Sequence, residues 1–136
     1  MNTTIFRRCA VGAAVLIMLA GCTGMGGPSV RYSNEVMTNE AGMTLYVFDK
    51  DVPGSGKSVC VAQCAKNWPP FTAAQNDREA GDWTVITRED GVRQWAYAGK
   101  PLYFWSKDQK AGDKTGDGVN NAWHVVKIPF STPLSR

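Results

Sequence analysis

The chain has 136 residues, a formal net charge of +3, one histidine and four cysteines. This length is enough for one domain of ordinary size. The small positive charge argues against a dedicated nucleic-acid-binding protein, and a lone histidine excludes any site that needs two. The sequence contains no serine–histidine–aspartate order, phosphate-binding glycine loop or zinc signature. We therefore expect no nucleic-acid partner, and enzymatic catalysis is the less favoured class of function.

The first 21 residues have the pattern of a secretory signal peptide. Arg7 and Arg8 precede an apolar stretch over 9–20, which is shorter than the about 20 residues that a membrane-spanning helix needs. The segment Leu-Ala-Gly-Cys ends at Cys22 and matches the bacterial lipobox, in which the cysteine is lipidated and the chain is cut before it. We expect acyl chains, palmitate among them, to anchor Cys22 in a membrane. An ordinary signal peptide with a chance cysteine is the alternative.

Removal of residues 1–21 leaves a chain of 115 residues that is close to neutral. We expect a lipidated cysteine and flexible tether over 22–30, a β domain over 31–130 and a short tail over 131–136. Thr23 follows the lipidated position, and in a Gram-negative cell the lack of aspartate there favours the outer membrane, facing the periplasm. The sequence thus predicts a bacterial cell-envelope protein whose first partner is the membrane.

The mature domain is expected to be mainly β. Its apolar residues are dominated by valine and aromatic side chains, which are enriched in strands. The dipeptides at 90–91 (Asp-Gly) and 98–99 (Ala-Gly) mark turns between alternating segments, and Asp-Gly favours type I′. The second half therefore predicts an antiparallel meander. The predicted strands cover 35–38, 45–48, 82–87, 92–97, 102–105 and 123–128.

The sequence contains an internal repeat. Segment 41–51 (AGMTLYVFDKD) aligns with segment 98–108 (AGKPLYFWSKD) at an offset of 57 residues, with six of eleven positions identical. Each copy is followed by a polar, glycine-rich segment and then a tryptophan. Two copies are too few for a solenoid, which needs at least about three. The duplication predicts two related antiparallel β units that share one core in one compact domain, with copies near 35–70 and 83–129.

Both copies carry the pattern Tyr-x-(Phe/Trp/Tyr)-x-x-Asp. Together with the lipobox and the segments CAKNWPPF and GDGVNNAWHVV, this pattern resembles the bacterial lipoproteins with the Yx(FWY)xxD motif, also called the secreted repeat of unknown function. The resemblance covers about residues 35–129. It implies an exported, often lipidated envelope protein with no established activity. The motif residues are Tyr46, Phe48 and Asp51 in the first copy and Tyr103, Trp105 and Asp108 in the second.

The motif residues allow two interpretations. Side chains two positions apart on a strand share a face, so each tyrosine and the following aromatic residue are expected to pack in a core between the halves. Each aspartate comes where its strand should end and can accept backbone N–H bonds there. The alternative is a ligand platform, in which exposed rings stack on a sugar, a quinone or another flat molecule.

Cys60 and Cys64 lie on the one predicted helix, Ser58–Asn67, where Ser58 is a candidate cap and two prolines prevent continuation. A cysteine pair in an exported protein usually forms a disulfide. On a regular helix, however, the Cβ atoms at i and i+4 are about 5–6 Å apart, and a disulfide requires about 3.5–4.5 Å. We expect a disulfide with a distorted turn. A redox-active or metal-binding dithiol is the alternative.

Two weaker patterns concern metal ions, for which we predict no resident site and no cofactor. A glycine-rich loop carries Asp108, Asp113 and Asp117, and calcium prefers several oxygen ligands from such a loop. The spacing does not match an EF-hand, and interleaved lysines oppose a cation. His124, on a predicted strand, is a candidate ligand for copper or haem with a methionine or the cysteine pair, although a lone histidine is more often structural.

Three hypotheses for the function follow. The first is a lipid-anchored envelope module that binds an envelope protein or a small ligand, because the catalytic patterns are missing. The second is a redox- or metal-linked envelope protein that uses Cys60 and Cys64. The third is an enzyme on an envelope carbohydrate that uses aromatic stacking and Asp51 or Asp108. Solvent exposure of the repeated tyrosines and aspartates separates the third from the first.

Overall fold

The computed structural model of the protein describes residues 26–127. The expected signal peptide, the lipidation site Cys22 and the tail over 131–136 lie outside the described residues. In the described part no helix is long and apolar enough to cross a membrane. The prediction of a mainly β fold with one short cysteine-bearing helix is confirmed.

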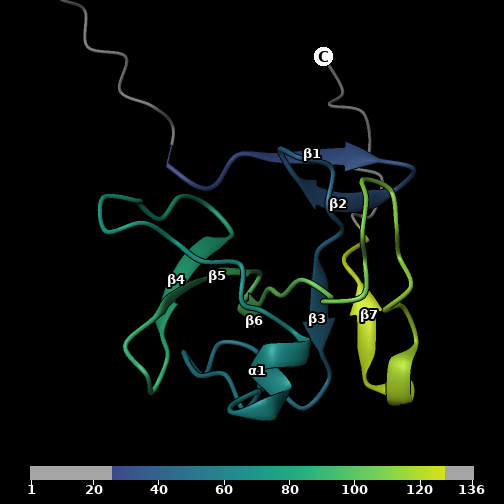
Figure 1. Ribbon diagram of the computed structural model, residues 1–136. Coiled ribbons are helices and arrows are strands. Elements are labelled where there is room, and N and C mark those ends of the chain that lie inside the picture. Colours follow the sequence, from purple (N-terminus) through teal and green to yellow (C-terminus); the bar gives the residue numbers. More distant parts are fainter. Residues whose placement is uncertain (1–25, 128–136) are drawn as a thin grey trace, which may run out of the picture.

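The strands form three small antiparallel sheets, each built around its own hairpin or pair (Figure 1). The first sheet pairs β1 (Val30–Ser33) with β2 (Val36–Asn39), the second pairs β3 (Tyr46–Phe48) with β7 (Trp123–Val125), and the third has the order β4 (Trp83–Thr87), β5 (Arg93–Tyr97) and β6 (Lys100–Pro101).

Strand β1 was not expected from the sequence. Asn34 and Glu35 both have positive φ (49° and 65°), as a two-residue turn between β1 and β2 requires. Val30, the last residue of the expected tether, already lies in β1. Upstream of it, the N–H of Gly27 donates to the carbonyl of Arg78 at 2.7 Å. The domain therefore holds this segment from its first described residues.

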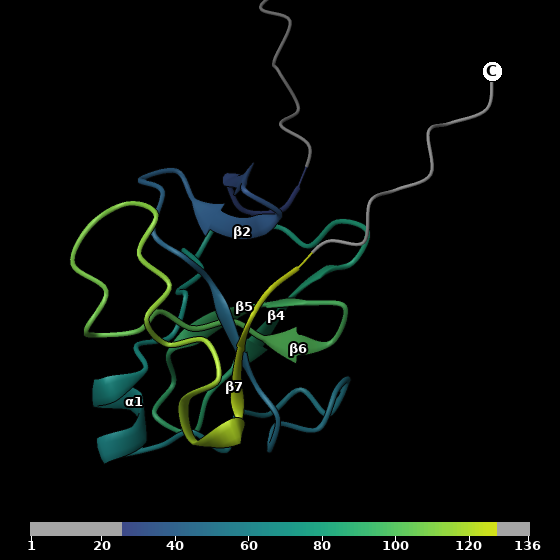
Figure 2. The same cartoon turned by 90° about the vertical axis from the view of Figure 1, so that its right-hand side faces the viewer.

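The predicted meander is right for three strands and wrong for the fourth. Strands β4, β5 and β6 follow one another, and Ala98 and Gly99 form the second turn with positive φ at both positions. The bounds expected for the third strand, 102–105, are wrong: β6 lies just before them at Lys100–Pro101, and only isolated bridges at Tyr103 fall within them. The last strand, β7, pairs with β3 instead of joining the meander, and Figure 2 shows the two side by side.

The predicted type I′ turn at Asp90 and Gly91 is also wrong. Only Gly91 has a positive φ, at 81°. The N–H of Arg88 donates to the carbonyl of Val92 at 2.9 Å, so three residues form the loop. Three-residue hairpin loops place one glycine in the left-handed region.

The helix is shorter than predicted. The structure has α1 at Gln63–Asn67, and Ala62 before it has φ +52°, which a regular helix does not allow. Ser58 is not the helix cap. The irregular backbone brings the Cα atoms of Cys60 and Cys64 to 5.1 Å, and the expected disulfide with a distorted turn is confirmed.

A pseudo-twofold axis relates the two copies of the repeat. The N–H of Tyr46 donates to the carbonyl of Tyr103 at 2.8 Å, and the N–H of Tyr103 donates to that of Tyr46 at 3.0 Å. Further along, equivalent pairs of hydrogen bonds follow on both sides of the axis. The N–H of Asp49 donates to the carbonyl of Ala122, and the equivalent bond runs from Ser106 to Asn67. The N–H of Val126 donates to the carbonyl of Leu45, and the equivalent bond runs from Phe71 to Leu102.

These bonds explain why β7 leaves the meander. The motif segment of each copy pairs with the tryptophan-bearing segment of the other copy, so β3 of the first copy takes β7 of the second. The two predicted β units therefore exchange strands and share one core, and neither half is complete alone.

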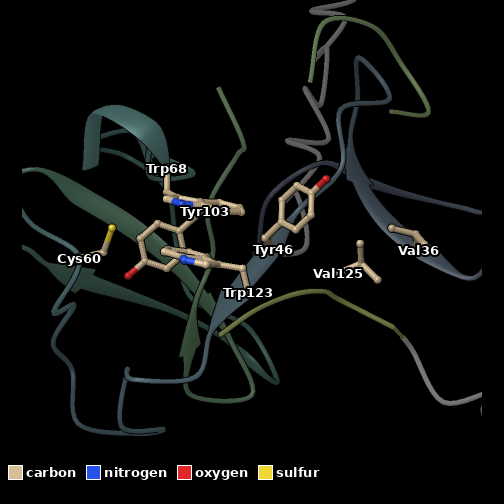
Figure 3. Packing of buried hydrophobic residues seen from close by; sticks show 7 residues of the cluster. All are labelled: Val36, Tyr46, Cys60, Trp68, Tyr103, Trp123 and Val125. Atoms are coloured by element: carbon tan, nitrogen blue, oxygen red, sulfur yellow. The ribbon is translucent and has the colours of Figure 1, made fainter. Parts of the chain in front are cut away.

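Four aromatic rings stack through the centre of this core. Phe48 lies on Trp123 (ring centroids 4.1 Å apart), Trp123 on Trp68 (3.8 Å) and Trp68 on Trp105 (4.0 Å). Figure 3 shows the rings of Trp68 and Trp123 lying parallel. The ring of Tyr46 meets Trp68 edge to face, as Tyr103 meets Trp123. The order of the stack is symmetric, because each motif ring covers the tryptophan of the other copy.

Candidate functional site

The motif tyrosines and aspartates pair across the axis, inside the core. The Tyr46 hydroxyl donates to Asp108 Oδ2 at 2.6 Å, and the Tyr103 hydroxyl donates to Asp51 Oδ2 at 2.5 Å. Both tyrosines are 0% exposed, and the aspartates are 4% (Asp51) and 8% (Asp108) exposed. The third motif residue of each copy, Phe48 in the first and Trp105 in the second, completes the ring stack. In this arrangement the motif tyrosines and aspartates bind each other and are closed to a ligand.

The second oxygen of each motif aspartate holds the loop that follows it. Asp51 Oδ1 accepts from the N–H of Val59 at 2.8 Å. Asp108 Oδ1 accepts from the N–H and the hydroxyl of Thr115, at 3.0 and 2.6 Å. Both aspartates thus accept the backbone N–H bonds that the sequence predicts, but from residues seven or eight positions further on rather than in the adjacent turn.

A buried arginine, Arg88, belongs to the network of the first aspartate. Its Nη1 donates to Ser58 Oγ and to Gln94 Oε1, both at 2.8 Å, and its Nη2 donates to the carbonyl of Cys60 at 2.6 Å. Ser58 in turn lies 2.7 Å from the Tyr103 hydroxyl. Sequence reasoning missed Arg88, since an arginine next to a turn usually faces solvent.

Burial sets the protonation of this network. It raises the pKa of both Tyr46 and Tyr103, and the neighbouring carboxylate raises each further. Burial also raises the pKa of Asp51, although the hydrogen bonds from Tyr103 and Val59 and the charge of Arg88 act in the opposite direction. Both tyrosines are therefore neutral hydrogen-bond donors at physiological pH.

The aspartates proposed for calcium do not converge. Asp113 caps its own turn, accepting from the N–H of Gln109 (2.9 Å) and of Lys110 (3.1 Å), and these bonds lower its pKa. Asp117 Oδ1 accepts from the N–H of Val125 at 3.1 Å. Within residues 26–127, no three His, Cys, Asp or Glu side chains gather where they could hold a metal ion.

His124 lies in an open cleft beside β7. Its Nε2 is 2.8 Å from Asp49 Oδ2, and the two side chains are 45% and 51% exposed. The cleft has a volume of about 730 Å³, whereas three other clefts in the described part have about 240 to 290 Å³. The lining residues are Val47, Asp49, Tyr97, Ala98, Lys100, Asp117, His124, Val125, Val126 and Lys127.

The other half of the molecule lacks this polar pair. The pseudo-twofold axis that pairs Val126 with Phe71 places Pro69 where His124 would be, and the repeat offset places Ser106 at the equivalent of Asp49. Sequence reasoning named His124 only weakly and missed Asp49. The repeat itself held the signal, because Asp49 against Ser106 is one of the positions at which the copies differ.

The apolar residues beside the cleft are also smaller than their equivalents across the pseudo-twofold axis. Val47 corresponds to Phe104, and Val126 corresponds to Phe71. The rings of Phe71 and Phe104 pack edge to face with centroids 5.5 Å apart. Smaller valines on one side of the axis leave room that two phenylalanines occupy on the other.

Comparison with known proteins gives one match. Residues 31–72 and 84–127 each match the model of the family described as "secreted repeat of unknown function". The two matched stretches coincide with the two copies of the repeat. No curated protein and no solved structure matches the chain.

Proposed function

The chain belongs to the family of secreted repeats of unknown function, and we propose that it is a lipid-anchored bacterial envelope protein that binds a small molecule. The lipobox supports the anchor, because Leu-Ala-Gly-Cys closes a signal peptide at Cys22. Thr23 favours the outer membrane, facing the periplasm, in a Gram-negative cell. The protein would act by binding, with the domain held close to the membrane.

One observation carries the binding role. The motif tyrosines and aspartates that the two copies share are buried and bonded to each other, whereas the polar pair that only one half carries lines an open cleft. Buried, satisfied residues explain the fold. Concave sites of about 300–1,000 Å³ with a few polar groups are where small molecules bind.

The two alternative hypotheses find less support in the geometry. An enzyme that uses Asp51 or Asp108 would need these carboxylates at the surface, and both are buried under tyrosine hydroxyls. A dithiol function would begin from a closed disulfide in which Cys60 is fully buried.

Mass spectrometry of the membrane-extracted protein tests the anchor. We expect the mature chain to begin at Cys22 with added acyl mass, and the Cys22→Ser variant to keep its signal peptide. An unmodified Cys22 in the mature protein would contradict the anchor and leave the binding role to be judged separately.

Native mass spectrometry of the protein in mild detergent tests the binding role. We expect wild-type protein to retain a small-molecule adduct that is missing when Val126→Phe narrows the cleft. The matched control is Ser106→Ala, at the position equivalent to Asp49, which should keep the adduct. Identical spectra for wild type and Val126→Phe would contradict binding in this cleft.

A further inference from the structure

We infer that the cleft beside β7 binds an anionic sugar, that is, a sugar that carries a carboxylate or a phosphate. This inference rests on the proposed binding function and names the ligand class of the same site. It follows from three properties of the lining: two lysines that form no ion pair with the described residues, carboxylates with one oxygen that these residues leave free, and an apolar floor.

The lysines supply the positive charge. Lys100 comes from β6 and Lys127 follows β7, so two separate elements bring their ammonium groups to one cleft. Both are exposed, and among the described residues neither forms an ion pair. Two ammonium groups that form no ion pair with residues 26–127 favour an anion between them, and each offers three donors.

The acidic residues supply acceptors for hydroxyl groups. Asp117 uses Oδ1 for the N–H of Val125, and the hydrogen bonds of the described residues leave its other oxygen free. Asp49 uses Oδ2 for His124 and likewise keeps Oδ1. A carboxylate oxygen accepts from a sugar hydroxyl but repels an anion. A lining with both signs therefore fits a ligand that has an anionic group at one end and hydroxyl donors at the other.

The floor of the cleft is apolar. Val47, Val125 and Val126 line it, and the half-buried ring of Tyr97 borders it. Aliphatic and aromatic surfaces of this kind pack against the C–H faces of a sugar ring. The volume of about 730 Å³ lies within the range of small-molecule sites.

The pseudo-symmetry shows that the fold does not need these residues. The equivalent positions carry Pro69 and Ser106 in place of the polar pair, and phenylalanines in place of Val47 and Val126. The same strand exchange forms there without them. The cleft is therefore a feature that one half has in addition to the shared scaffold.

Calorimetric titration of the full chain in detergent tests the ligand class. The probes are N-acetylmuramic acid, which carries a carboxylate, glucose 6-phosphate, which carries a phosphate, and neutral N-acetylglucosamine. We expect at least one acidic probe to bind saturably, and to bind at least tenfold more tightly than the neutral sugar. The stronger of the two acidic probes identifies the anionic group. Equal binding of neutral and acidic sugars would overturn the role of the lysines.

Variants locate the binding. Lys100→Met and Lys127→Met should each weaken the acidic probe at least threefold, while Lys107→Met, an exposed lysine of the other half, should leave its affinity unchanged. These are surface changes, so they do not threaten folding. Val47→Phe should abolish binding, with near-ultraviolet circular dichroism as the check on its fold. Unchanged affinity in both lysine variants would overturn this site.

The outcomes separate the inference from the proposed function. If native spectra show an adduct in the cleft but no acidic probe binds, the ligand class is wrong and the binding function stands. If neither an adduct nor probe binding is found, both are wrong.

Discussion

In the first copy of the repeat Tyr46 reaches Asp108 of the second copy, and in the second Tyr103 reaches Asp51 of the first. Each copy thus supplies the buried acceptor that the other needs. The copies differ at the surface of β7, where His124 contacts Asp49. The position equivalent to His124 in the first copy is Pro69.

The comparison shows which positions of the duplicated sequence serve folding and which are available for binding. Positions that must agree for two halves to exchange strands are the motif positions, since each motif side chain contacts the other copy. Positions at the surface, such as Asp49 and His124, are free to differ. The motif that identifies the family is therefore informative about folding, and the differences between copies are informative about binding.

The largest expected effect is loss of a central ring. Trp68→Ala and Trp123→Ala should each lower the free energy of unfolding by about 3–5 kcal/mol, because each removes a buried indole that stacks on two rings. Urea unfolding measures both. The shared core predicts similar losses. A loss from one variant that is less than half that of the other would contradict equal contributions of the two tryptophans to the shared core.

Alkaline pH should weaken the fold through the two motif tyrosines. Their pKa values are raised in the folded state, so their contribution is complete below about pH 10, the unfolded pKa, and is lost as pH rises toward the folded pKa. Each tyrosine should contribute a loss of about 1.4 kcal/mol per pH unit above pH 10. Urea unfolding between pH 9 and 11 measures the slope. Tyr46→Phe should lower that slope, and an unchanged slope would show that Tyr46 ionises freely.

Removal of one motif hydroxyl should cost less than removal of a central ring. Tyr46→Phe and Tyr103→Phe each leave a buried carboxylate without its donor, at a cost of about 1–3 kcal/mol at neutral pH. Tyr97→Phe, on a half-buried ring of β5, is the matched control and should stay within about 0.5 kcal/mol of wild type. Equal stability of wild type and both motif variants would refute the structural role of the motif.

The disulfide belongs to one half only, and its effect should be smaller still. It closes a short loop between Cys60 and Cys64, so the unfolded chain loses little freedom and we expect at most about 2 kcal/mol from it. The double variant Cys60→Ala/Cys64→Ala should unfold at a urea concentration close to that of reduced wild-type protein. A double variant that does not fold at all would show that the first half requires the disulfide to fold.

The sequence was sufficient for the features that repeat. The β class, the duplication and the packing of Tyr46 and Tyr103 between the halves follow from local pattern and spacing, and the structure has them. The disulfide follows from the expected export of the chain, although the spacing of Cys60 and Cys64 required a distorted turn. The strand exchange could not be predicted, because pairing of β3 with β7 joins residues far apart in the chain. Reasoning from sequence neighbours alone pairs each strand with the next one along the chain, and so adds the last strand to the meander.

The cleft was largely beyond sequence reasoning for a related reason. Asp49 and His124 are 75 positions apart and meet only because the strands exchange. Arg88 was missed because its burial depends on the irregular backbone before α1, which positions the carbonyl of Cys60 to accept from it. A comparison of the two copies, position by position, is the sequence signal that points to Asp49.

Unfolding of the cleft variants tests the central claim most directly. If the unshared residues serve binding and not folding, Asp49→Ala and His124→Ala should each change the free energy of unfolding by no more than about 0.5 kcal/mol, since the pair is half exposed. In the same urea series, Tyr103→Phe should lose at least about 1 kcal/mol. Cleft variants that lose as much stability as Tyr103→Phe would show that the His124–Asp49 pair is part of the scaffold, and would contradict the account.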